Sequence, residues 1–147
     1  MSIRFSSQTE KFEPHDTERL RLWLTEVIKR HGKSVGNINY LFSDDEQMLQ
    51  ANIRYLNHDT YTDIITFDYV SGGLVSGDIL VSIDRVGENA MKYSVSLDEE
   101  LRRVVVHGVL HLLGQGDKTD VEAAKMRRRE ADALALWDEL FHEGRMS

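Results

Sequence analysis

The chain has 147 residues, of which 41% are hydrophobic, enough for one compact domain but not for two. Its 25 acidic and 18 basic residues give a net charge of −7, which argues against unspecific adhesion to nucleic acid or anionic lipid, so any polyanion must be bound at a local patch. The lack of cysteine excludes disulfides, thiolate metal sites and a thiol nucleophile, and it fits a reducing compartment.

Neither a membrane span nor an export signal is evident in the sequence. No apolar run approaches the ~20 residues that cross a bilayer. Residues 1–5, MSIRF, lack the apolar core of a signal peptide. The sequence therefore predicts a soluble, cytoplasmic protein in which residues 1–147 form a single domain, with no membrane partner.

The N-terminal part of the chain alternates between strand and helix patterns. Ile3 and Phe5 alternate with polar residues as in a short strand, and Pro14 then precedes a helix that extends to about His31. Residues 35–42 alternate well enough to predict a second strand.

Two capping-box signatures mark the next helices. Ser43 with Glu46 opens one helix, and Ser96 with Glu99 opens another. Between them lie two β-branched segments, residues 63–69 and 77–83, which should pair as strands. A weaker helical stretch follows at residues 84–93.

The helix that Ser96 opens extends to about Leu113 and is apolar nearly all round, so we expect it to be central and buried. Its apolar residues are Leu101, Val104, Val105, Val106, Val109, Leu110 and Leu112. Gly-Gln-Gly at 114–116 ends it, and a last helix begins near Thr119 and extends to about His142. Helices and a small mixed sheet of about four strands would share one core, which predicts an α+β fold.

Two histidines on the buried helix form the candidate site. His107 and His111 lie four residues apart, which at 3.6 residues per turn stacks them on one side of the helix. Asp117 follows six residues after His111, and the glycines on either side of Gln115 allow the chain to fold back toward the two rings. The predicted metal ligands are therefore His107, His111 and Asp117.

Each of these residues also has a purely structural interpretation. An isolated histidine on an apolar helix is usually a core residue with a hydrogen-bond partner, but two stacked histidines favour a shared ion, because a metal satisfies one nitrogen of each. Asp117 by itself is equally well explained as a turn residue or as a cap of the last helix.

The sequence around these residues resembles a known family. Residues 106–117 read VHGVLHLLGQGD and resemble the H-G-x-L-H-L-x-G-Y-D-H signature of the YbeY rRNA maturation factors, which are bacterial metal-dependent endoribonucleases. The likeness extends to TDIITF at 62–67, to GDI at 77–79, and to Met126 and Glu130, which match the M and E after the signature. The resemblance implies a zincin-like arrangement, in which the central helix carries the metal ligands.

The chain departs from the family pattern at three places. Asp117 takes the place of the third histidine, which keeps a ligand but lowers the formal charge of the site from +2 to +1. Greater tolerance of manganese is therefore expected. Leu56 takes the place of an arginine, so that arginine's role at the scissile phosphate does not carry over, and Arg54 lies two residues away. Tyr61 replaces a proline.

The resemblance implies a single-strand-specific endoribonuclease that matures the 3′ end of 16S rRNA and acts in ribosome quality control. One divalent ion per chain, with zinc expected, would leave a coordination position for water, which is then the attacking group. No general base is assigned. Asp59 or Asp63 could reach the water in place of the glutamate that a peptidase mechanism uses, although a turn role and a strand-edge role are preferred for them. His58 is interpreted as a loop residue.

The RNA would need a concentrated positive patch, and Lys118 beside the third ligand is the predicted substrate contact. Further basic candidates, which also suit a solvated helix face with an Arg127–Glu130 ion pair, are Arg102, Arg103, Lys125, Arg127, Arg128 and Arg129. The implied partners are single-stranded rRNA and the small ribosomal subunit or its proteins.

Two other functions stay open. A non-catalytic, metal-stabilised ribosome assembly factor is favoured by the missing arginine. A metallopeptidase is disfavoured, because Gly108 stands where such enzymes carry their glutamate base.

Overall fold

The computed structural model describes residues 1–142, and residues 143–147 at the end of the predicted domain lie outside the described part. Its strands are β1 (Ile3–Ser7), β2 (Ser34–Ser43), β3 (Ile64–Asp68) and β4 (Leu74–Ser82). Its helices are α1 (Thr17–Arg30), α2 (Asp45–Leu56), α3 (Ile83–Tyr93), α4 (Leu97–Leu112) and α5 (Asp120–Leu140). None of the helices within residues 1–142 has both the length and the apolar composition that a membrane crossing needs.

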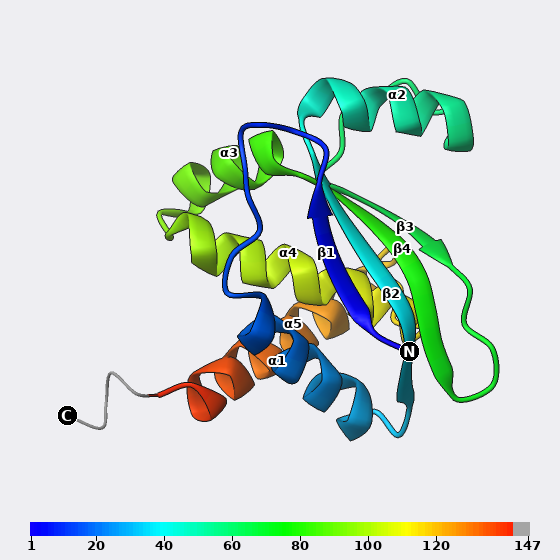
Figure 1. Cartoon of the computed structure of the whole chain (residues 1–147), viewed down its shortest axis with the longest axis vertical. Helices are drawn as coiled ribbons and strands as arrows, with labels where there is room; N and C mark the ends of the chain where they lie inside the picture. The colour runs from blue at the N-terminus through cyan, green and yellow to red at the C-terminus, as the bar shows by residue number, and fades with distance from the viewer. Residues whose placement is uncertain (143–147) are drawn as a thin grey trace.

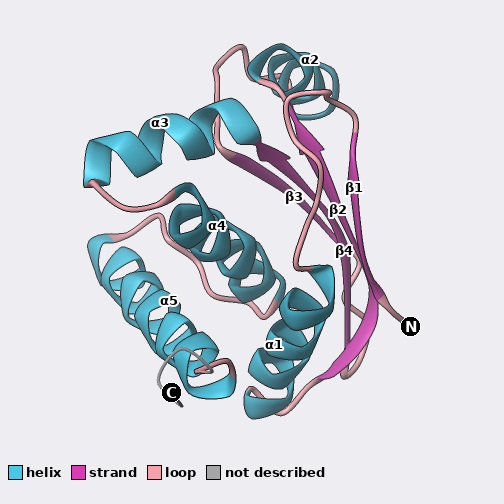
Figure 2. Ribbon diagram, turned by 60° about the vertical axis from the view of Figure 1, so that its left-hand side comes forward, coloured by secondary structure: helices cyan, strands magenta, loops and turns pink. Residues whose placement is uncertain are grey.

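The strands form one mixed sheet in the order β1-β2-β4-β3. β2 pairs in parallel with β1 and β4, whereas β3 pairs antiparallel with β4 and forms one edge. Figures 1 and 2 show α1, α4 and α5 on one side of the sheet, with α4 between the sheet and α5, and α2 at the upper end. The predicted α+β class and the small mixed sheet are confirmed.

Helix α4 is the centre of the core, as its apolar sequence predicts. All seven of the apolar residues expected to be buried are at most 5% exposed. The hydroxyl of the buried Tyr40 on β2 donates a hydrogen bond of 2.6 Å to the carbonyl of Val105, which fixes the helix to the sheet. Because the helix is held from several sides, the two histidines it carries have a defined position.

Two glycines let α4 approach the sheet closely. A Cβ atom on Gly108 would lie 3.0 Å from Ile79 and 3.1 Å from Ile64. A Cβ on Gly77 of β4 would lie 2.6 Å from the Phe67 carbonyl oxygen and 2.8 Å from Leu112, at the end of α4. The absence of side chains at these positions therefore determines how near the histidine-bearing turn comes to the sheet.

Element boundaries differ from the predictions where a polar side chain has another partner. Asp44, not Ser43, caps α2, and its reciprocal partner is Gln47 rather than Glu46. Ser43 still belongs to β2, and its hydroxyl accepts a hydrogen bond from Gln8. Ser96 does cap α4 through the main-chain N–H of Glu99.

Three other helix and strand ends shift by a few residues. Helix α1 begins at Thr17, three residues after Pro14. Ile83 is the first residue of α3 rather than the last of a strand, because the Ser82 side chain caps that helix. Helix α5 ends at Leu140, two residues before His142.

We expect Gly77→Ala to lower the free energy of unfolding by about 1–3 kcal/mol, because the added methyl group meets a main-chain oxygen that cannot easily move. Gly87→Ala in α3 is the matched control, since a Cβ there meets nothing within 4 Å. That control should gain about 0.5–1 kcal/mol from helix propensity. Urea denaturation of both variants measures the difference, and equal stabilities would contradict the close packing of α4 on β4.

Candidate metal centre

Helix α4 and the turn after it bring three ligand-type atoms together. His107 Nε2 and His111 Nε2 each lie 3.4 Å from the same oxygen, Oδ2 of Asp117. One ligand atom from each of the three residues lies within 4.8 Å of the others, so the group could hold a metal ion. The two imidazole rings are 4.6 Å apart between centroids and inclined by 78°.

The turn that returns Asp117 to the helix depends on Gly114. Helix α4 ends at Leu112, and Gly114 has a φ of +95°, which residues with a side chain rarely adopt. The buried Gln115 then holds the turn through a hydrogen bond of 2.8 Å to the carbonyl of Gly116. The sequence predicted this reversal from the Gly-Gln-Gly segment, and the structure shows it.

Burial and charge favour the neutral imidazole that a metal requires. Burial of the ring, followed by the neighbouring His107, lowers the pKa of His111, while Asp117 opposes this shift. An unprotonated ring nitrogen is the form that coordinates a cation, so the ligand state is favoured around neutral pH.

A buried carboxylate on α5 fixes the orientation of the His107 ring. Glu130 is 5% exposed, and its Oε2 lies 2.5 Å from Nδ1 of His107. A carboxylate can only accept, so Nδ1 carries the proton and donates it. The lone pair of Nε2 is then directed to the side where His111 and Asp117 lie, which is the tautomer found in carboxylate–histidine–metal arrangements.

Glu130 belongs to a buried ionic network. Arg103 donates to Glu130 at 3.3 Å and to the buried Glu100 at 2.5–3.1 Å. The two carboxylates raise the pKa of Arg103 far above its usual value, so it stays charged. One cation thus stabilises two buried carboxylates, one of which holds His107.

This network overturns two predictions. Arg103 is not available as an RNA contact, because both of its partners are buried carboxylates. Glu130 pairs with Arg103 and His107 on the buried side of α5 and not with Arg127. A signal for this role existed in the sequence, since the glutamate shares one face of its helix with apolar residues, namely Met126, Ala133 and Trp137.

The other predicted residues lie outside the cluster. Lys118 follows Asp117 and is exposed. The guanidinium of Arg102, which is half-buried, lies over Trp137, 4.8 Å from the ring centroid. Lys125, Arg127 and Arg128 are exposed on α5, and Arg129 is partly buried.

Within residues 1–142, neither of the two candidate bases joins the three convergent side chains. Asp59 is exposed in the loop after α2, and the carbonyl of Asp63 accepts a hydrogen bond from Ser82 at the start of β3. His58 is an exposed loop residue, as predicted.

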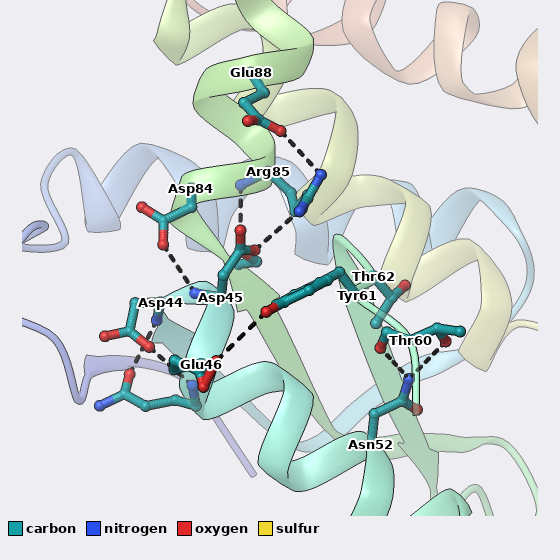
Figure 3. Close-up of polar contacts among 12 residues, drawn as sticks. Asp44, Asp45, Glu46, Asn52, Thr60, Tyr61, Thr62, Asp84, Arg85 and Glu88 are labelled. Atoms are coloured by element: carbon teal, nitrogen blue, oxygen red, sulfur yellow. Dashed lines mark hydrogen bonds and ion pairs between the residues drawn. The ribbon is translucent and has the colours of Figure 1, made fainter. Parts of the chain in front are cut away.

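Side-chain contacts stabilise the loop in which the family carries a proline (Figure 3). The Tyr61 hydroxyl donates to Glu46 of α2 at 3.4 Å, and the guanidinium of Arg85 of α3 lies 5.1 Å from the tyrosine ring centroid. Asn52, which is buried, donates to the carbonyl of Thr60 at 2.8 Å. These contacts connect the loop to α2 and α3.

The arginine expected next to this loop has no substitute. Leu56 is the last residue of α2 and is 42% exposed. Arg54 lines a groove on the face of the sheet away from α4, and none of the three convergent residues lines that groove.

The fold and the site define an α+β protein with two imidazoles and one carboxylate arranged to hold a cation, an arrangement typical of metal-dependent hydrolases. Comparison with known proteins gives the family. The model of the family described as endoribonuclease YbeY matches residues 3–138. The chain belongs to this family and is a nuclease.

The relatives cover nearly the same length of chain. The endoribonuclease YbeY of Flavobacterium johnsoniae is 47% identical over 135 residues, which are 92% of this chain and 96% of the relative. That of Porphyromonas gingivalis is 49% identical over 117 residues, 80% of this chain and 78% of the relative. The solution structure of TM1509 from Thermotoga maritima matches with a TM-score of 0.62 at 25% identity and covers 96% of this chain and 95% of that one.

We expect Arg103→Met to destabilise the protein by about 3 kcal/mol, because it leaves Glu100 and Glu130 buried without a cation. Arg128→Met, on the exposed side of α5, is the control and should stay within about 0.5 kcal/mol of the wild type. The free energy of unfolding from urea titration is the measurement. A loss as small as that of the control would show that the network does not stabilise the fold.

Proposed function

We propose that this chain is a single-strand-specific metallo-endoribonuclease that matures the 3′ end of 16S rRNA in the cytoplasm and takes part in ribosome quality control. Residues 1–147 act as a single hydrolase domain, and one ion, zinc in the first place, is held by His107, His111 and Asp117. The observation that carries the proposal is the convergence of two Nε2 atoms on one Asp117 oxygen in a chain of this family.

The donor set suits zinc. Two neutral imidazoles and one carboxylate are common zinc ligands, and three protein ligands leave a position open. When bound, such an ion supplies Lewis-acid activation of water and of a phosphoryl oxygen. The harder Asp117 oxygen also makes manganese acceptable.

The chain's own residues hold and orient the site. Glu130 keeps the proton of His107 on Nδ1 and so keeps Nε2 free. Asp117 is the most exposed of the three residues, with 37% of its side chain accessible, so the side of the cluster that an RNA phosphate can approach is the Asp117 side. In this proposal Lys118, which is exposed and next in sequence, contacts that phosphate.

A peptidase mechanism has no support at this site. Gly108 lacks the carboxylate of a His-Glu-x-x-His enzyme, and the space beside it is filled by Ile64 and Ile79. A second candidate function, a non-catalytic assembly factor stabilised by its metal, is favoured by one observation, the leucine at position 56 where the family has an arginine.

Replacement of one ligand separates these two functions. His111→Ala should keep its fold, lose stoichiometric zinc and lose cleavage of a single-stranded 16S rRNA 3′ fragment by about 100-fold or more, since Lewis-acid stabilisation is worth several kcal/mol. His142→Ala, an exposed histidine after α5, is the control. Cleavage rate, metal content and melting temperature are measured on all three proteins. A wild type that binds zinc but does not cut, with a variant that melts much earlier, would support the assembly factor instead.

Glu130→Gln tests the orientation of His107. The amide can still accept a hydrogen bond but carries no charge, so zinc affinity should fall about 10- to 100-fold. Glu139→Gln, exposed near the end of α5, should bind zinc as the wild type does. Competition with a chelator gives the affinities, and circular dichroism checks the fold. Equal affinities for the two variants would show that Glu130 has no part in holding the metal ligand.

A further inference from the structure

A groove of about 1110 Å³ lies on the face of the sheet away from α4. Strand register shows how its floor is built: Arg4 pairs with Asn39, Asn39 with Asp78, and Asp78 with Phe67, so the four side chains form one row across all four strands. On β1, β2 and β4 these residues alternate with buried or half-buried ones that face the helices. Helix α2 forms the wall of the groove, with Ala51, Arg54 and Tyr55 among its lining residues.

Aromatic rings lie open along this groove. Tyr55 is 61% exposed and Tyr69 is 59% exposed, and both line the groove together with Phe67. Tyr55 and Phe67 meet edge to face, with 5.8 Å between their centroids, so each ring keeps a face or an edge for a further contact. Flat, exposed rings on a sheet are the surface on which nucleobases stack.

The groove also holds arginines that have no carboxylate partner within the described residues. Among the described residues, Arg54 has no polar partner. The only polar partner of Arg4 among them is the hydroxyl of Ser2, at 3.3 Å. By contrast, Arg21, Arg30 and Arg85 each pair with a carboxylate. In a protein with a net charge of −7, two cations left free beside open rings are a local patch for phosphates.

The single carboxylate on the groove floor is Asp78. It accepts a hydrogen bond of 3.1 Å from Asn39. Partial desolvation of the Tyr69 hydroxyl, followed by the negative charge of Asp78, raises the pKa of Tyr69. An aspartate and an amide side by side match the hydrogen-bonding edges of bases, such as the amino group of cytosine. The polar row across the floor suits bases better than an apolar peptide side chain.

We infer that this groove is a second RNA-binding surface, which holds single-stranded RNA by stacking bases on Tyr55, Phe67 and Tyr69 and by pairing phosphates with Arg4 and Arg54. The inference rests on the proposed function for the nature of the ligand. Strand β3 separates the two surfaces: Ile64 packs against Gly108 of the metal-site helix, and Phe67 faces the groove. In this proposal, RNA held in the groove passes around the edge strand β3 to reach the metal centre.

Binding of a fluorescent oligouridine of about 12 nucleotides, followed by anisotropy in the cold on the zinc-loaded protein, tests this inference. Replacing Tyr55 and Tyr69 together by alanine should raise Kd at least about 10-fold, since each stacked base contributes separately. Replacing both by phenylalanine keeps the rings and should leave Kd within about 2-fold. Tyr93→Ala, an exposed tyrosine on α3, is the surface control.

Arg54→Ala should lower the slope of log Kd against log salt by about 0.7, the value for one phosphate contact to a single strand. Arg128→Ala, exposed on α5, should leave the slope unchanged. If the alanine variants, with unchanged melting temperatures, bind the oligonucleotide as the wild type does, the groove does not hold RNA and the inference is overturned.

His111→Ala distinguishes failure of this inference from failure of the proposed function. If the groove binds RNA, this variant should bind the oligonucleotide with unchanged Kd although it does not cut it. Loss of binding in His111→Ala, with the groove variants unaffected, would place all RNA contacts at the metal centre and overturn the groove alone. If binding depends on Tyr55 and Tyr69 but the wild type does not cut RNA, the groove inference stands and the proposed nuclease function is refuted.

Discussion

The hydrogen bond from His107 Nδ1 to the buried carboxylate of Glu130 determines the chemistry of the candidate site. It decides which ring nitrogen carries the proton, and therefore which one faces His111 and Asp117. The carboxylate is stable in its buried position because Arg103 lies between it and Glu100. The ligand geometry thus depends on α5 as much as on α4, although α5 contributes no ligand.

The turn after α4 is the second constraint. A helix can present two ligands at i and i+4, but a third donor must come from elsewhere, and here it comes from only six residues further along the chain. The positive φ of Gly114 reverses the chain within that distance. Histidine and aspartate both supply an electron-pair donor, which is what the end of this short turn must carry.

Much of this arrangement could be predicted from the sequence because the signals are local. Helix periodicity placed His107 beside His111, and the apolar residues around them predicted a buried helix, which the structure confirms. What could not be predicted depends on contacts between distant segments. Glu130 and Arg103 are 27 residues apart, and a run of three arginines next to Glu130 suggested a solvated helix face instead. The predicted capping residue of α2 is wrong by one position, because Gln8, far away in sequence, donates a hydrogen bond to Ser43 and Ser43 stays in the sheet.

The departures from the family pattern have different physical consequences. Tyr61, which stands in place of the proline, contacts two helices. Leu56 does not compensate for the missing arginine, since its side chain is apolar and Arg54 serves the opposite face of the sheet. We therefore propose that phosphate recognition in this chain depends on other cations, namely Lys118 next to Asp117 and the arginines of the groove.

The most direct test of this account is the position of the metal itself. Crystals of the zinc-loaded protein, with diffraction recorded on both sides of the zinc absorption edge, would locate the ion without reference to activity. We predict one fully occupied zinc ion about 2.0–2.2 Å from Nε2 of His107, Nε2 of His111 and an oxygen of Asp117, with the Glu130 hydrogen bond to Nδ1 intact. An ion bound through Nδ1, or a structure in which Asp117 turns away from both rings, would contradict it.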